Sequence, residues 1–236
     1  MVRGKLIVLE GIDGSGKTTQ TKMLVARLKR EGYAVETIDF PQYYTTFFGK
    51  MVAQYLRGEF GALDQVSPYL AAILYAGDRF ERKEQLEQWL AEGKIVIANR
   101  YVSANMGHQA SKIPRSKRAV FVQWLDQLEY GVFRVPRADR IFFLHVPTKI
   151  AHRLIDQKAK EERRYAHGRK RDIHEQSAGH LLETEKAFLE LCHHQPEWKM
   201  IECTERGKIL FPEEIHGKVW NAIQEFLQPE RKKRGE

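Results

Sequence analysis

An eight-residue motif near the start of the chain constrains its fold more than any other feature. Residues 11–18 read Gly-Ile-Asp-Gly-Ser-Gly-Lys-Thr and match the phosphate-binding pattern G-x-x-x-x-G-K-[ST] at every fixed position. A short apolar run at 5–9 precedes the motif, as expected of a buried parallel strand, and a helical pattern follows at 19–29. The motif therefore lies between a predicted strand and the start of a predicted helix, which is the context that such a loop requires.

The residue types of this motif explain how it can bind a phosphate chain. Glycines at positions 11, 14 and 16 open backbone conformations closed to other residues, so that successive N–H groups can point into one concavity. The first N–H groups of the following helix and the positive end of its dipole also favour a bound phosphate. The pattern assigns Lys17 to the outer phosphates and the Thr18 hydroxyl to Mg²⁺. The predicted cofactor-binding set is Gly11, Ile12, Asp13, Gly14, Ser15, Gly16, Lys17, Thr18 and Thr19.

Apolar runs and helical patterns alternate along the rest of the chain. Further strands are predicted at 34–40, 94–98, 140–146 and 199–203, and further helices at 46–57, 67–91, 115–130, after 147, 173–193 and 212–227. A loop is expected to carry Asn105, His108 and Gln109. This order predicts an α/β fold of the P-loop NTPase type, with a five-stranded parallel sheet and helices on both faces. Ligands of such sheets bind at the carboxyl ends of the strands.

Composition narrows the class of protein. Hydrophobic content of 42% and charged content of 30% are typical of a soluble globular protein, and no apolar run approaches the length of a membrane span. We therefore expect no membrane partner. Cys192 and Cys203 are the only cysteines, which favours a reduced cytoplasmic location. Cys192-His193-His194 lacks further ligands at metal-binding spacing and is interpreted as a helix end.

The formal net charge of +8 is compatible with nucleic acid as a partner and equally with a protein that handles several phosphates. Much of the basic content lies at 163–171 and in the tail, 229–236, which we interpret as a solvated end. No recognisable nucleic-acid-binding motif accompanies the charge, so no nucleic-acid partner is expected. A nucleic-acid-binding P-loop ATPase stays an alternative.

Four stretches of the chain stand out together. They are LEGIDGSGKTTQ at 9–20, Phe-Pro at 40–41, LYAGDRFE at 74–81, and Asn-Arg-Tyr at 99–101 with Ser103 and Asn105. Together they resemble the thymidylate kinase family, whose members transfer the γ-phosphate of ATP to thymidine monophosphate (dTMP). Order and spacing match from about residue 5 to residue 110, and 172–175 is also similar. The resemblance implies a single kinase domain over 1–236, with ATP and Mg²⁺ as cofactors, dTMP as substrate and a homodimeric state.

Tyr75 and Arg79 lie four residues apart in a predicted helix and therefore share one face. An aromatic ring can stack on a pyrimidine, and an arginine one turn on can donate hydrogen bonds to a base carbonyl. The resemblance implies that this pair binds thymine, and it adds Phe40 and Asn105 to the substrate site. For the pair taken alone, the alternative is a buried tyrosine and a surface arginine.

Arg100 follows the end of a predicted strand, where it can face phosphates. The resemblance implies that it contacts the phosphate of the acceptor and aligns it for in-line transfer, which depends mainly on positioning and charge neutralisation. It also implies that Asp13 contacts the 3′-hydroxyl of the acceptor sugar near the transferred phosphate. The alternative is that Arg100 pairs with Asp13 or Asp39 for structural reasons.

Three positions depart from the family pattern. Asn99 stands where the family usually has an aspartate that supports Mg²⁺, so Thr18 is the one protein ligand that we expect. His108 replaces an aromatic residue that packs against the sugar, which makes discrimination against ribose less secure. Tyr43 lies where some members carry an arginine for the acceptor phosphate, and it can donate a hydrogen bond instead.

The basic segment 158–171 is interpreted as a lid that closes over the triphosphate and neutralises charge during transfer. The phosphate-binding loop offers Gly14 and Ser15 rather than an arginine, so the resemblance indicates the class whose catalytic arginine lies in the lid. Arg163 and Arg164 are the first candidates and Arg169 the next. A solvated helix face is the alternative for such a run. A kinase for another nucleoside monophosphate or for a deoxynucleoside also stays open, although Tyr75, Arg79 and Asp13 favour the thymine nucleotide.

Overall fold

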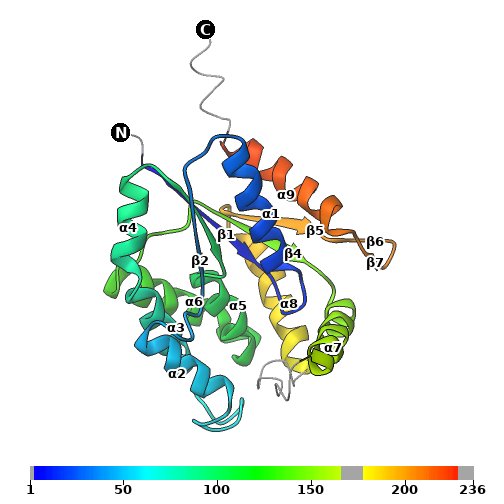
Figure 1. The fold of residues 1–236 in the computed structure, drawn as a ribbon. Helices are drawn as coiled ribbons and strands as arrows, with labels where there is room; N and C mark the ends of the chain where they lie inside the picture. Colours follow the sequence, from blue (N-terminus) through cyan, green and yellow to red (C-terminus); the bar gives the residue numbers. More distant parts are fainter. Residues whose placement is uncertain (1–2, 166–177, 228–236) are drawn as a thin grey trace.

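A five-stranded parallel sheet forms the centre of the molecule in the computed structural model, which describes residues 3–165 and 178–227 (Figure 1). The strand order is β2-β3-β1-β4-β5, and the bounds are β1 Lys5–Glu10, β2 Val35–Asp39, β3 Ile95–Asn99, β4 Arg140–His145 and β5 Trp198–Glu202. The predicted parallel sheet of the P-loop NTPase fold is confirmed. Leu9 of β1 pairs in register with Asn99 of β3 and Phe142 of β4, so these three strands end at the same edge.

Nine α-helices are described around the sheet. They are α1 Lys17–Arg30, α2 Phe47–Leu56, α3 Pro68–Phe80, α4 Lys83–Ala91, α5 Val102–His108, α6 Arg115–Asp126, α7 Thr148–Tyr165, α8 Ala178–His194 and α9 Pro212–Leu227. A 3₁₀ turn at Ala110–Lys112, a π-helical turn at Gln127–Val132 and a hairpin of β6 Thr204–Glu205 and β7 Lys208–Ile209 complete the described elements. The hairpin has no counterpart among the elements predicted from the sequence. None of the described helices combines the length and apolar character needed to cross a membrane.

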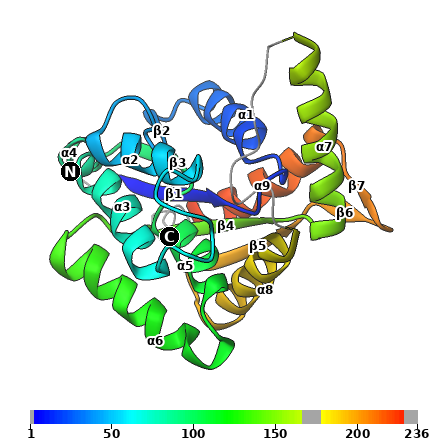
Figure 2. The same cartoon turned by 90° about the horizontal axis from the view of Figure 1, so that it is seen from below.

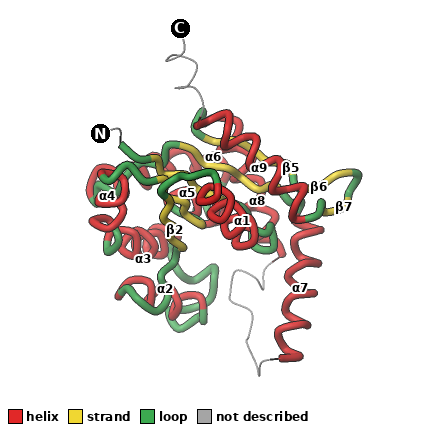
Figure 3. The backbone as a smooth tube through the Cα atoms, turned by 45° about the horizontal axis from the view of Figure 1, so that its top comes forward, coloured by secondary structure: helices red, strands yellow, loops and turns green. Residues whose placement is uncertain are grey.

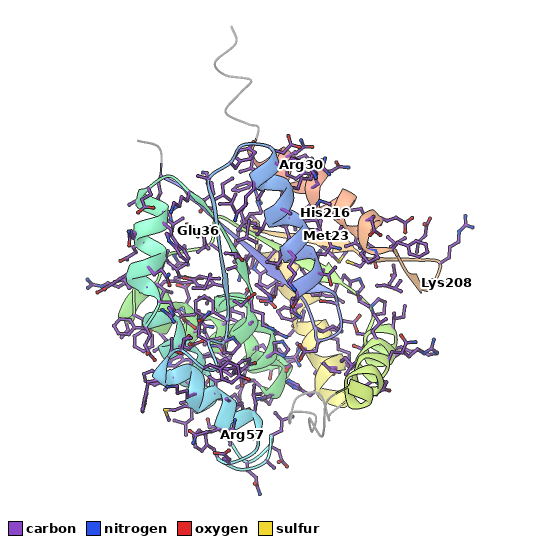
Figure 4. The ribbon with its side chains drawn as sticks, viewed as in Figure 1. Met23, Arg30, Glu36, Arg57, Lys208 and His216 are labelled. Carbon is purple, nitrogen blue, oxygen red and sulfur yellow. The ribbon has the colours of Figure 1, made fainter. Side chains whose placement is uncertain are left out.

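Helices cover both faces of the sheet because the strands are apolar on both sides. Leu6, Ile7, Val8 and Leu9 of β1 are completely buried. Helix α1 lies on one face and α6 and α8 on the other (Figure 2). Helix α9 packs against α1 and β5. Figure 4 shows His216 of α9 beside α1, and the nearby charges of Arg27 and Arg30 join burial in lowering the pKa of that histidine.

Helix α7 projects from the carboxyl end of β4 (Figure 3). Its first turns contact the phosphate-binding loop so closely that a Cβ on Gly14 would lie 2.7 Å from the carbonyl oxygen of Ala151. Gly14 also has a φ of +82°, which disfavours any side chain there. The base of the helix that leads to the predicted lid is therefore packed directly on the loop.

The single helix predicted over 67–91 is wrong, because the chain forms α3 and α4 with a break at Glu81 and Arg82. The Glu81 carboxylate accepts hydrogen bonds from the backbone N–H groups of Phe47 (2.9 Å) and Phe48 (2.8 Å). It thereby satisfies free donors at the start of α2, a tertiary contact that the local pattern does not reveal.

The loop predicted for Asn105, His108 and Gln109 is also wrong, because residues 102–108 form α5. Asn and Gly are poor helix formers, but Val102 and Met106 lie one turn apart and are buried. Packing of α5 against α8 therefore overrides the weak local propensity. The helix predicted over 115–130 likewise ends earlier, at Asp126, and continues as the π-helical turn.

Candidate active site

The phosphate-binding loop joins β1 to α1, as its motif predicts. Lys17 folds back over the loop, and its Nζ donates hydrogen bonds to the carbonyl oxygens of Gly11 and Ile12, both at 2.9 Å. Burial, with the positive charge of Arg100 as a smaller contribution, lowers the pKa of Lys17 to about 8. This lysine is thus held where an anionic ligand in the loop would favour its charged form.

Thr18 lies exposed at the start of α1, beside the end of β3. The Asn99 side chain donates a hydrogen bond from Nδ2 to the Thr18 hydroxyl at 3.5 Å. Among the described residues, no cluster of three or more histidine, cysteine or acidic side chains could hold a metal ion. The donors present fit Mg²⁺ held by one hydroxyl, phosphate oxygens and water, which is how this ion is commonly bound beside a nucleotide.

Arg100 stands at the carboxyl end of β3 and faces the phosphate-binding loop. Its Nη2 donates to Asp13 Oδ1, so the pairing raised as the structural alternative does occur with Asp13. Its backbone has a φ of +65°, an uncommon conformation for a non-glycine residue. Burial alone would raise the pKa of Asp13, but the charges of Arg100 and Lys17 outweigh burial and lower it. The pairing does not remove Arg100 from the site, because Asp13 belongs to the loop itself.

Glu10, the last residue of β1, lies completely buried behind this pair. It accepts hydrogen bonds from the Ser103 hydroxyl (2.7 Å) and from the backbone N–H of Gly11 (3.0 Å). Burial raises its pKa, although Arg100 and Lys17 oppose the effect. Glu10 and Ser103 belong to the stretches that resemble the family, but no role was predicted for either.

Arg79 is nearly completely buried, which contradicts the alternative of a surface arginine. Its Nε donates to Glu129 Oε2 at 3.0 Å, its Nη2 donates to the other oxygen of that carboxylate, and its Nη1 donates to the Tyr101 carbonyl at 3.2 Å. Asn105 joins this network by donating to Glu129 Oε1 at 3.2 Å and to the Ala72 carbonyl. The network connects α3, α5 and the π-helical turn.

Tyr75, one turn before Arg79, is only partly buried and packs edge-on against Tyr55, with ring centroids 6.4 Å apart. Phe40 is buried, with its ring 5.8 Å from that of Tyr101. Tyr43 is partly buried and belongs to the same small apolar cluster as Tyr75. Against the effect of burial, Asp13 and Glu10 raise the pKa of Arg100, and Tyr43 and Tyr75 lie close enough to contribute to the same rise. The predicted base-binding residues and the predicted phosphate-binding residue therefore lie in one region.

His108, at the end of α5, is also buried, and its Nε2 lies 2.6 Å from Nη1 of Arg100. Its ring centroid is 5.8 Å from that of His180 and 5.7 Å from that of Phe188, both on α8. The side chains of Arg163 and Arg164, residues 166–177 with Arg169, and the tail at 229–236 lie outside the described part of the chain.

Sequence reasoning missed Glu129, the partner of Arg79. It lies within the helix predicted over 115–130, and its position relative to the buried residues of that helix is the signal that could have identified it. Glu129 lies four residues after the buried Leu125, so an acidic side chain shares the inward face of that helix. A buried carboxylate of this kind needs a cationic partner.

Comparisons with known proteins bear directly on this site. The family model described as thymidylate kinase matches residues 9–215. The chain belongs to the thymidylate kinase family.

Two relatives and one solved structure align with most of this chain. A probable thymidylate kinase of Thermococcus kodakarensis is 30% identical over 230 residues, covering 95% of this chain and 99% of the relative. A thymidylate kinase of Mycobacterium tuberculosis is 28% identical over 186 residues, covering 79% and 85% respectively. The solved thymidylate kinase of Candida albicans superposes with a TM-score of 0.69 at 21% identity, over 94% of this chain and 92% of that chain, and supports the fold.

Proposed function

We propose that this thymidylate kinase family member transfers the γ-phosphoryl group of ATP to dTMP, producing ADP and dTDP. One observation carries the proposal. Arg100 pairs with Asp13 of the phosphate-binding loop, and Tyr43 and Tyr75 lie close enough to join Asp13 and Glu10 in raising the pKa of Arg100 against the effect of burial. A phosphate acceptor bound by Arg100 would thus face the donor nucleotide held by the loop, and in-line transfer depends on this alignment.

The donor side would bind ATP through the backbone N–H groups of residues 11–19 and through Lys17. Lys17 would leave the carbonyl oxygens of Gly11 and Ile12 and pair with the outer phosphates. Thr18 would hold Mg²⁺ with phosphate oxygens and water, and Asn99 would orient the Thr18 hydroxyl through the hydrogen bond seen here. The bound ion would neutralise charge on the phosphates.

On the acceptor side, Tyr75 would stack on the pyrimidine, and Phe40 would line the same site. Arg79 would donate to a base carbonyl from its N–H groups beyond the three that bind Glu129 and Tyr101. Asn105 would read the base edge, and Tyr43 would donate a hydrogen bond to the acceptor phosphate. Asp13 would accept a hydrogen bond from the 3′-hydroxyl of the sugar.

The proposal also includes a lid, in a segment whose side chains lie outside the described part of the chain. Residues 158–171 would close over the triphosphate, with Arg163 or Arg164 neutralising charge on the transferred group. The close packing of Gly14 against Ala151 supports the idea, because it fixes the base of α7 on the loop. The whole chain, 1–236, would act as a single kinase domain.

A coupled assay for nucleoside diphosphate formation tests the function. ATP, Mg²⁺ and dTMP should produce dTDP at a higher kcat/KM than dUMP, UMP or thymidine gives. A stronger preference for another acceptor would refute the choice of dTMP. ATP hydrolysis that DNA or RNA stimulates, without transfer to dTMP, would favour the nucleic-acid-dependent ATPase instead.

We further propose that the protein is a homodimer in the cytoplasm. Tyr69 of α3 packs on Phe121 of α6, with ring centroids 4.9 Å apart. Their neighbours in the sequence, Leu70 and Val120, are 62% and 64% exposed. Large exposed apolar side chains at such a contact favour an interface. Sedimentation equilibrium should give a dimer that the double variant Leu70→Glu/Val120→Glu converts to a monomer. Two free cysteines fit a reducing compartment.

A further inference from the structure

The contact between His108 and Arg100 restricts the protonation state of the histidine. Nη1 of Arg100 lies 2.6 Å from Nε2 of His108. A guanidinium group has donors and no acceptor, so the ring nitrogen that faces it has to accept. An imidazole accepts at Nε2 only when it is neutral and carries its single proton on Nδ1.

This contact also determines where Arg100 is held. On one side its guanidinium group pairs with Asp13 of the phosphate-binding loop, and on the other it contacts His108 at the end of α5. The Arg100 side chain is 17% exposed, and its backbone is in the left-handed region. Two partners from different elements thus hold an arginine whose proposed task requires accurate placement.

We propose that His108 is a positioning residue, which holds Arg100 toward the acceptor phosphate through a hydrogen bond to its neutral ring. This inference rests on the proposed function. It gives the histidine at this position a task that an aromatic hydrocarbon ring cannot perform, because such a ring offers no nitrogen to accept the hydrogen bond. A second proton on His108 would remove the acceptor and place a cation against Arg100, so this hydrogen bond requires the neutral ring.

Other ionisable groups lie near His108. Burial lowers the pKa of His180, on α8, to about 4, and it lowers the pKa of Lys112, in the 3₁₀ turn, to about 7. Asp13 faces Arg100 from the loop. A substitution at His108 leaves these three groups in place, so a comparison of the variants with wild type at one pH isolates the contact with Arg100.

The test measures kcat/KM for dTMP at pH 8.0 in wild type and in three variants. They are His108→Gln, whose amide oxygen can accept from Arg100 without titrating, His108→Phe, which has no acceptor, and His216→Gln as a control on α9. Each variant is expressed as its ratio to wild type under the same conditions.

At pH 8.0 the proposal predicts that His108→Gln stays within about threefold of wild type while His108→Phe loses about tenfold, as for one hydrogen bond to a charged group. The His216→Gln ratio should stay near one. A loss for His108→Gln as large as that for His108→Phe would overturn the proposal.

A second measurement does not depend on activity. ¹⁵N NMR of the histidine rings at pH 8.0, with His108 assigned by its absence from the His108→Gln spectrum, should show Nε2 without a proton and Nδ1 protonated. A proton on Nε2 would overturn the proposal whatever the kinetics show. If wild type phosphorylates no acceptor, the proposed function fails, and this spectrum still decides the state of His108.

Discussion

Lys17 connects the sequence motif to the chemistry at the scale of one side chain. Replacing it by alanine removes the cation that reaches the outer phosphates, and we expect kcat for dTDP formation to fall by about 100-fold or more. Lys22→Ala is the matched control, because this lysine is exposed on the same helix. Steady-state kinetics with saturating ATP measure both. Activity of Lys17→Ala near that of the control would contradict the role of Lys17.

Arg79 combines a proposed binding task with a structural one. Arg79→Ala should raise KM for dTMP, and it should also cost about 3–5 kcal/mol of unfolding free energy because Glu129 is left charged, buried and unpaired. The double variant Arg79→Ala/Glu129→Gln separates the two effects. Urea denaturation should show partial recovery of stability, whereas KM for dTMP stays high. Recovery of both would mean that Arg79 acts only through the fold.

The sequence identifies the site residues that belong to a local motif and misses contacts between residues far apart in the chain. Lys17 and Thr18 are identified because the phosphate-binding loop is local, so that fixed spacing carries its chemistry. The Arg79–Glu129 pair joins residues 50 positions apart, and no local pattern encodes it. The contact of His108 with Arg100 depends on α5 being a helix, which the local sequence does not favour.

Helix α5 is held in place by close packing against α8. A Cβ on Gly107 would lie 2.3 Å from Cε1 of Phe188. Gly107→Ala should therefore cost about 1–3 kcal/mol of unfolding free energy through overpacking. Gly217→Ala in α9 is the matched control, since nothing lies within 4 Å of its Cβ position, and there alanine should gain up to about 1 kcal/mol. Thermal denaturation of both variants checks this, and equal effects would argue against tight packing of α5.

A histidine between two carboxylates joins the ends of β4 and β5 to α7 and α8. His145 lies 2.7 Å from Glu202 through Nδ1 and 3.0 Å from Glu185 through Nε2, and Glu185 also accepts from the backbone N–H of Thr148 at 2.9 Å. The hydrogen bond to Glu185, against the effect of burial, raises the pKa of His145. Although burial opposes it, hydrogen bonding lowers the pKa of Glu185 and of Glu202. The cluster is strongest when the histidine is charged and both carboxylates are ionised.

This charge state predicts how the cluster depends on pH. The contribution of His145 is complete below its unfolded pKa of about 6.5 and is lost as pH rises through its raised folded value. The contribution of the two carboxylates is lost as pH falls through their lowered values. Urea denaturation should thus show His145→Gln about 1 kcal/mol less stable than wild type near pH 5.5, with a smaller difference at pH 8.5. A difference that grows with pH would contradict this, and the exposed His193→Gln should show no such trend.

The secondary elements were predictable where the signals were local. Helix α9 has the predicted bounds, Pro212–Leu227, because proline at its first position and a regular apolar face both mark it. The break between α3 and α4 was missed because the Glu81 carboxylate accepts a hydrogen bond from the start of α2, which lies far from it in the sequence. Helix boundaries that depend on a distant partner cannot be derived from one sequence.

At the scale of the whole molecule, the parallel sheet brings the parts of the site together. Strands β1 and β3 are neighbours and end in register, so the phosphate-binding loop after one faces Arg100 after the other. Helices α3 and α5 bring the Arg79 network to the same side. The order of strands and helices along the chain predicts this meeting point, since ligands of such sheets bind at the carboxyl ends of the strands.

The central claim is that donor and acceptor nucleotides meet across this edge of the sheet. A crystal structure with dTMP and a non-hydrolysable ATP analogue tests it most directly. We expect the thymine ring on Tyr75 and within hydrogen-bond distance of Arg79, with the dTMP phosphate at Arg100 and facing the γ-phosphate beside Lys17. A thymine ring remote from Tyr75 and Arg79, or a dTMP phosphate directed away from Lys17, would contradict the account.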